Sequence, residues 1–216
     1  MARGSAETKE RIVQAAARLL ARDGHRAVGI NAVAEEAGTD KVLIYRYFGG
    51  LPGLLGTVAR SHPLWPSADA LVRSAPSLEH ALHVALLETG RAIRERAVAR
   101  ELLVWELAER NEVTAELAAV RERETEALIA ALRSRFPVPQ FLDLPALYAL
   151  LSSALAYLAL RATGGDGDRT FTLAPSTEPD WRRIERATAA TVRAVVGVMG
   201  DCLGPGAGGW GAGGCG

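Results

Sequence analysis

Apolar and polar residues alternate with a period of three to four along most of the chain, a spacing typical of amphipathic helices. The first such pattern runs from about Glu7 to Arg22 and stops at Asp23-Gly24. Two shorter patterns follow within Ile30–Phe48 and meet at Gly38. Glycine readily adopts the positive φ that ends a helix tightly. The first of these short patterns, over 30–37, therefore predicts a helix that ends in a sharp turn.

The turn after Gly38 is about three residues long, the length found in helix-turn-helix motifs. Either Thr39 or Asp40 can cap the next helix by accepting a hydrogen bond from its free N–H groups, and we expect Asp40 to act as a cap rather than as a reader of cytosine. That helix carries five apolar or aromatic side chains within six positions: Val42, Leu43, Ile44, Tyr45 and Tyr47. No more than about half of such a surface can face a core. The remainder is expected to contact a partner, and a DNA major groove fits a helix-turn-helix motif.

Further patterns predict a connecting helix over 51–61 and a larger helical body. Pro52 suits the first turn of the connecting helix, where its missing N–H is not needed. Gly53 and Gly56 each weaken a helix interior by about 1 kcal/mol relative to alanine, which predicts a pliable connector. Prolines at 63 and 66 interrupt the pattern and mark the boundary of the body. Within the body, helical spacing predicts helices over about 77–96, 98–107, 114–135, 143–161 and 180–199.

Composition agrees with an all-α fold. The chain has 216 residues, of which 49% are hydrophobic and only 6% aromatic, so it can bury a sizeable core and favours helix over strand. A loop is expected over 163–179, which is rich in Gly, Asp, Thr and Pro. The Gly-rich tail over 204–216 lacks the lysine and the following helix of a phosphate-binding loop, and we expect it to be disordered.

The charge is unevenly divided although the net charge is zero. Residues 1–60 hold nine Lys or Arg against six acids, and the remainder holds sixteen against nineteen, which gives +3 and −3. A basic head on a mildly acidic body suits a protein whose first domain binds a polyanion.

Several classes of site are not indicated by the sequence. The two cysteines, Cys202 and Cys215, form no closely spaced pair, which favours a reducing cytoplasm over a disulfide framework. His80 and His83 have a spacing that can share a metal, but no third ligand is matched to them, and we expect no metal site. There is no nucleophile motif or cofactor loop, so we expect no enzyme activity, no catalytic residues and no cofactor.

No membrane association is expected either. The N-terminus has no apolar segment of the signal-peptide type. The uncharged stretch Leu144–Leu160 falls just short of the roughly 18 to 20 residues that span a bilayer, and it contains Pro145 and two serines. We therefore interpret it as a buried helix.

An ordered set of residues between Glu7 and about Ala59, roughly a quarter of the chain, resembles the TetR/AcrR family of bacterial ligand-responsive repressors. The matches are Ile12, Ala15, Ala16, Leu19, Asp23-Gly24, Val33-Ala34, Ala37-Gly38, Lys41, Tyr45-Arg46-Tyr47-Phe48 and Leu54-Leu55. The chain departs from the family pattern at Gly29, Asp40, Val42 and Leu51-Pro52-Gly53, where the family commonly has threonine, serine, glycine and a lysine-glutamate pair. These departures bear on phosphate contacts and on the operator sequence.

The resemblance implies how the second short helix would bind DNA. Lys41, Tyr45 and Tyr47 would contact phosphate, and Thr39 would contact phosphate or a base. Val42 and Leu43 could touch thymine methyl groups, and Arg46 could reach phosphate or a guanine edge. Phe48 is expected in the core, and Arg11, Arg18 and Arg22 lie on a helix face that is either solvated or near phosphate.

The resemblance also implies a domain plan and partners. Residues 1–50 would form a three-helix DNA-binding domain, 51–61 the connecting helix, and 62–203 a helical ligand-binding and dimerisation domain. The function expected is that of a homodimeric repressor in the cytoplasm, released from a palindromic operator by an unknown small-molecule effector. The last two helices of each subunit would form the dimer interface. The alternative is a helical protein-interaction module whose helix-turn-helix does not read DNA.

The candidates for the effector pocket are His83, Trp105, Glu124 and Tyr148. At 100° per residue, Arg121 and Glu124 fall on the apolar side of their helix. A charge that faces a core must be paired or open to a cavity to offset its desolvation. An internal ion pair, a groove open to water and a polar spot in a ligand pocket all remain open for Glu124.

Overall fold

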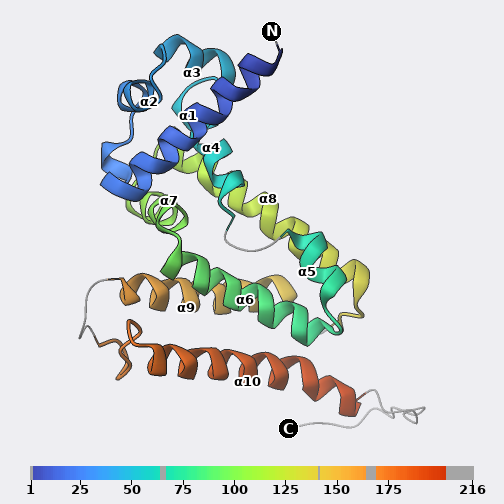
Figure 1. The fold of residues 1–216 in the computed structure, drawn as a ribbon. Coiled ribbons are helices and arrows are strands. Elements are labelled where there is room, and N and C mark those ends of the chain that lie inside the picture. Colours follow the sequence, from blue (N-terminus) through green and yellow to red (C-terminus); the bar gives the residue numbers. More distant parts are fainter. Residues whose placement is uncertain (1, 64–66, 141, 164–168, 203–216) are drawn as a thin grey trace.

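The computed structural model describes residues 2–63, 67–140, 142–163 and 169–202, and within these ranges it is an all-α protein, as the sequence predicts. Figure 1 shows a head near the N-terminus and a layered body of longer helices below it. The elements are α1 (Ala2–Asp23), η1 (His25–Ala27), α2 (Ile30–Glu36), α3 (Lys41–Phe48), α4 (Leu51–Ser61), α5 (Ala68–Ser74), α6 (Leu78–Glu95), α7 (Ala97–Ala108), α8 (Glu112–Arg135), α9 (Leu144–Ala162) and α10 (Glu178–Cys202).

Local sequence signals set the boundaries of α2 and α3. Gly38 has a φ of 58°, as expected for the residue that ends α2. The Asp40 side chain accepts a hydrogen bond of 2.8 Å from the Val42 N–H and so caps α3. Gly49 then ends α3 in the left-handed conformation. The helix-turn-helix geometry therefore follows from short-range chemistry, which explains why the sequence predicts it well.

The core of the head continues into the body. Ile12, Leu20, Ile44 and Leu54 are fully buried within α1, α3 and α4. The same hydrophobic cluster includes residues of α7 and α8: Val98, Leu102, Trp105, Val113 and Leu117. Head and body are thus joined by shared apolar packing as well as by α4.

Helix α4 packs tightly in spite of its glycines. A Cβ atom on Gly53 would overlap the carbonyl oxygen of Phe48, and one on Gly56 would lie 2.7 Å from an Oε1 atom of Glu116 on α8. The neighbouring Leu54, Leu55 and Val58 are completely buried. The glycines allow α4 to approach its neighbours closely, and in this structure that close packing replaces the pliable connector expected from helix propensity.

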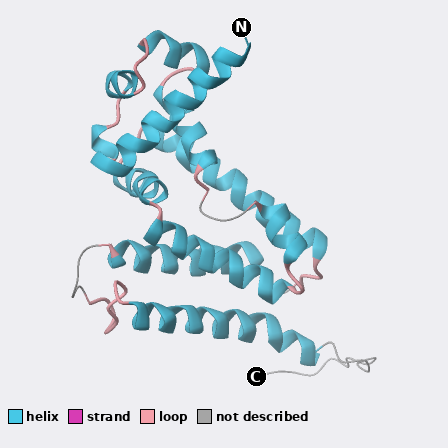
Figure 2. Ribbon diagram, viewed as in Figure 1, coloured by secondary structure: helices cyan, strands magenta, loops and turns pink. Residues whose placement is uncertain are grey.

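In the body, α6 packs against both α9 and α10, and α5 packs against α6 and α8. Figures 1 and 2 show α10 below the α6–α9 pair. Figure 2 shows long helices joined by short loops. Trp181 of α10 lies against Gly90 of α6. A Cβ atom added to Gly90 would lie 2.9 Å from the Cζ2 atom of Trp181. Trp181, Ile184, Thr188 and Val192 form the buried stripe of α10. Because glycine has no side chain, position 90 lets α6 and α10 approach closely.

Helix α9 is only half buried, and here the sequence prediction of a buried helix is wrong. Leu144, Tyr148, Leu155 and Ala159 face the core, whereas the opposite side leaves Leu150 72% and Tyr157 50% exposed. By length and composition, α9 could cross a membrane, and only 22% of its apolar window is buried inside this fold. Hydropathy alone does not distinguish an apolar face that packs within its own chain from one that meets a second surface.

The predicted tail over 204–216 and residues 164–168 of the loop predicted over 163–179 lie outside the described residues. The described part of that loop contains a bridge between Thr170 and Leu173.

Candidate nucleic-acid interface and ligand pockets

Helix α3 presents a continuous outer face. Lys41 and Arg46 are exposed, and Val42 and Tyr45 are unusually exposed for apolar or aromatic residues, at 60% and 55%. Ile44, on the opposite side, is completely buried. Thr39, Leu43 and Tyr47 are half-buried, and the last two pack against the head core. Phe48 also packs against that core, as expected. Four of the seven predicted DNA contacts therefore lie on one open surface, and the other three border it.

A cationic cluster flanks this face, and one of its members was missed by sequence reasoning. The Arg46 guanidinium lies 4.9 Å from the Tyr47 ring centroid and donates a hydrogen bond of 2.9 Å to the Tyr47 hydroxyl. Lys9 of α1 places its Nζ atom 5.3 Å from the same ring centroid. Hydrogen bonding with Ser5, and then with Arg46, lowers the pKa of Tyr47. Lys9 reaches this cluster because α1 crosses α3, a proximity that has no signal in the sequence.

Three arginines of α1, Arg11, Arg18 and Arg22, make contacts within the head. Arg18 and Arg22 both pair with Glu36 of α2, at 2.8 and 3.3 Å. The Nε atom of Arg11 donates a hydrogen bond of 3.0 Å to the carbonyl oxygen of Ala37. These contacts join α1 to α2, and the side chains of Arg18 and Arg22 remain 52% and 57% exposed.

Two pockets of the body share one wall. The first, which we call the α4 pocket, lies between α4, α7 and α8 and has a volume of about 60 Å³. The second, the α9 pocket, lies between α6, α7, α8 and α9 and measures about 290 Å³. Leu103, Glu106 and Arg121 line both pockets.

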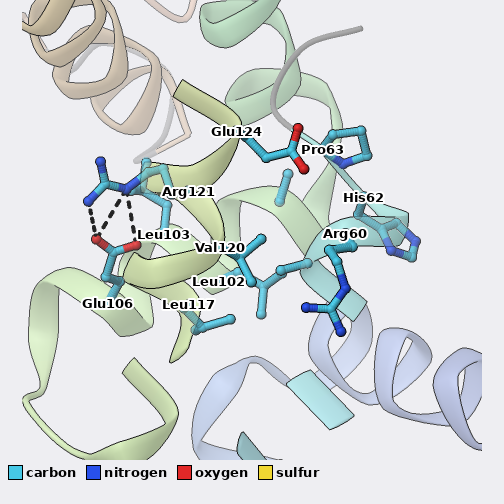
Figure 3. A pocket seen from close by; sticks show the side chains of 12 residues that line it. Arg60, His62, Pro63, Leu102, Leu103, Glu106, Leu117, Val120, Arg121 and Glu124 are labelled. Carbon is cyan, nitrogen blue, oxygen red and sulfur yellow. Dashed lines mark hydrogen bonds and ion pairs between the residues drawn. The ribbon is translucent and has the colours of Figure 1, made fainter. Parts of the chain in front are cut away.

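The shared wall is an ion pair. Arg121 contacts Glu106 through N–O distances of 2.7, 3.2 and 3.3 Å. Figure 3 shows this pair at one side of the α4 pocket, and Glu124 beside Pro63 at another. The hydrogen bonds with Glu106 raise the pKa of Arg121 further above its usual range. Arg121 is therefore paired internally, with Glu106 rather than with Glu124.

The structure separates the four candidates for the effector pocket. Glu124 lines the α4 pocket and Tyr148 lines the α9 pocket. Trp105 lines neither, because it is buried under the head with its ring 5.6 Å from the ring of His25. His83 also lies outside both pockets. Burial, and then the charge of His80, lowers its pKa, and its Nε2 atom is buried without a hydrogen-bond partner among the described residues.

The Tyr148 phenol is buried, and its hydroxyl oxygen lies 3.4 Å from the Thr89 hydroxyl oxygen. Burial raises the pKa of Tyr148 to about 12, from an ordinary value of 10.0. In the described part of the chain, no group of three or more His, Cys, Asp or Glu side chains is placed to hold a metal ion.

This pKa predicts a loss of stability at high pH. Below pH 10 the phenol is protonated in both the folded and the unfolded chain. Between pH 10 and about 12 it ionises only in the unfolded chain, so the free energy of unfolding decreases. The decrease reaches about 3 kcal/mol near pH 12. Absorbance at 295 nm, followed against pH, should show that one of the four tyrosines ionises last. Tyr148→Phe should remove that step, and the prediction is contradicted if the last step persists in the variant.

The head has the arrangement of a DNA-binding motif. In a helix-turn-helix, the second helix of the motif lies in the DNA major groove, and α3 has that position and an open outer face. Residues 12–55 match the sequence profile described as bacterial regulatory proteins of the tetR family. The segment that carries the helix-turn-helix is thus similar to bacterial regulatory proteins of the tetR family.

Solved structures share the fold across most of the chain. A TetR family transcription regulator from Marinobacter aquaeolei VT8 has a TM-score of 0.54 at 16% identity, covering 89% of this chain and 98% of its own. A protein from Rhodococcus sp., described as a TetR-family transcriptional regulator, has a TM-score of 0.57 at 18% identity and the same coverages, 89% and 98%. A regulator from Streptomyces coelicolor A3(2) has a TM-score of 0.53 at 18% identity, covering 88% and 98%. No curated protein sequence matches the chain.

Proposed function

We propose that this regulator is a homodimeric repressor that binds a palindromic operator in the cytoplasm and is released by a small-molecule effector. The observation that carries the proposal is the outer face of α3, on which Lys41, Val42, Tyr45 and Arg46 are exposed together. A cation beside apolar and aromatic groups suits a duplex, which must be held by its phosphates and read at its base edges.

Each side chain of this face has a proposed role. Lys41 and Tyr45 contact phosphate, and Val42 packs against a thymine methyl group. Thr39, Leu43 and Tyr47 lie at the border of the face and contribute secondary contacts. Arg46 is held by Tyr47, which orients its guanidinium towards phosphate or guanine. Lys9 adds a further cation beside this pair.

The exposed faces of α9 and α10 support a dimer. Leu150 and Tyr157 lie seven residues apart on α9, so they share one face of the helix. Small residues of α10 are exposed beside its arginines, among them Ala187, Ala190 and Ala194. A second copy that covers both helices would bury α9 and close a four-helix bundle. Two heads placed about 34–36 Å apart would then enter successive major grooves.

The position of the α4 pocket suggests how an effector would act. Ala59 and Arg60 of α4 line it together with residues of α7 and α8. Since α4 also packs on the head, a ligand that moves α4 shifts the head. We call the dimer splayed when its heads are too far apart to enter successive major grooves. An effector that binds the splayed dimer more tightly than the DNA-binding form lowers operator affinity by the ratio of its two affinities.

The proposal is tested by selecting bound sequences from random duplex DNA with the full chain. We expect a palindrome to be enriched, and Lys41→Ala and Tyr45→Ala to bind it more weakly. Lys41→Ala removes one phosphate contact per head. The slope of the logarithm of the binding constant against the logarithm of the salt concentration should therefore fall by about two per dimer. Arg133→Ala, which removes an exposed cation from α8, is the control and should bind as the unaltered chain does.

The alternative proposal is a helical protein-interaction module whose helix-turn-helix does not read DNA. It is favoured if a folded dimer enriches no sequence even at low salt. The exposed Val42 and Tyr45 would then form a contact with another protein.

A further inference from the structure

We infer that the α4 pocket binds an amphipathic organic cation, with the positive group paired to Glu124 and the apolar part against Leu102, Leu117 and Val120. This inference rests on the proposed ligand response and adds the chemical class of the ligand. Its basis is the pairing of the charged groups that line the pocket: Arg60, His62, Glu106, Arg121 and Glu124.

The cationic groups of the pocket already have partners. Arg121 is bound by Glu106 and also by Glu122, at 3.1 Å. Arg60 donates a hydrogen bond of 3.0 Å to the Thr57 hydroxyl and lies 3.7 Å from Glu116. The His62 imidazole lies within hydrogen-bond distance, 3.0 Å, of the Val58 carbonyl oxygen. An anionic ligand would have to compete with these contacts.

Glu124 differs from all of these residues. Among the described residues, its half-buried carboxylate has no ion pair and no hydrogen bond. Most of the remaining lining is apolar. A carboxylate beside apolar walls loses part of its hydration without a compensating contact, and a cation supplies that contact. An anion placed in the same pocket would be repelled by Glu124.

The size of the pocket links binding to regulation. A volume of about 60 Å³ holds only a small group. A ligand with a longer apolar part must therefore widen the space between α4 and the α7–α8 pair. Movement of α4 is the change that would alter the spacing of the heads.

The test uses three eight-carbon probes with small head groups: octylammonium, octanoate and 1-octanol. Binding to the full-length dimer is measured by isothermal titration calorimetry without DNA. We expect the cation to bind most tightly. Glu124→Gln should weaken its binding by about tenfold or more, because the charge–charge attraction is removed. Glu126→Gln, which neutralises an exposed carboxylate half a turn away, should leave binding unchanged.

Other results would overturn the inference. These are equal or tighter binding of octanoate or octanol, no binding of any probe, or an equal affinity for the cation in Glu124→Gln once circular dichroism shows that the variant is folded. Failure of the proposed function is seen separately. If the cation binds through Glu124 but leaves DNA binding unchanged, the site stands and effector-driven release is wrong.

Discussion

Leu150→Glu is expected to convert the proposed dimer to a monomer and to weaken binding to the proposed operator by about a hundredfold or more. Leu150 is 72% exposed on the face of α9 that also carries Tyr157. In a twofold-symmetric interface each substitution occurs twice, so two carboxylates would be buried together. A monomer has one head and loses the gain in effective concentration from linked binding, typically about 10² to 10⁴.

Sedimentation velocity and a DNA-binding titration measure the two effects together. Ala130→Glu, which adds the same charge at an exposed position of α8, is the matched control and should remain a dimer. A Leu150→Glu variant that is still dimeric would place the interface elsewhere on the chain.

Gly53→Ala is expected to destabilise the head by about 2 kcal/mol. A Cβ atom at this position would overlap the backbone carbonyl oxygen of Phe48, and a backbone atom cannot rotate away as a side chain can. Forced overpacking typically costs about 1–3 kcal/mol. The better helix propensity of alanine offsets up to about 1 kcal/mol of the loss. An overpacking cost of about 3 kcal/mol, reduced by about 1 kcal/mol of helix propensity, gives the expected loss of about 2 kcal/mol.

Urea denaturation provides the measurement, with a lower midpoint at an unchanged slope as the expected result. Gly4→Ala makes the same change in α1, where no atom lies within 4 Å of the added Cβ, and should leave stability equal or slightly higher. Equal midpoints for Gly53→Ala and the unaltered chain would show that α4 can shift away from Phe48 at little cost.

Sequence reasoning succeeded where structure depends on neighbours along the chain. The cap at Asp40 and the turn at Gly38 each involve residues within one turn of the chain. The outer face of α3 was predictable for the same reason, because one short helix held more apolar residues than it could bury.

It failed where the contact joins distant segments. The backbone N–H of His25 donates to Glu101 across 76 positions of the chain, and Lys9 meets Tyr47 only because two helices cross. Trp105 was a reasonable pocket candidate by residue type, yet it lies beneath the head. Arg121 was expected to lie on the apolar side of its helix. Its partner Glu106 belongs to α7, so the pattern of residues within α8 could not predict the pairing.

The shared core of head and body bears on the construction of chimeric regulators. Chimeras that exchange heads between relatives are simplest when the exchanged unit folds by itself. A cut after Ser61 in this chain would separate Ile12 and Leu54 from Val98, Leu102 and Trp105, which belong to the same cluster. A grafted head would need to match the surface of α7, or the graft would leave a cavity at the junction. New operator preferences are better introduced by replacing only Val42, Tyr45 and their exposed neighbours on α3.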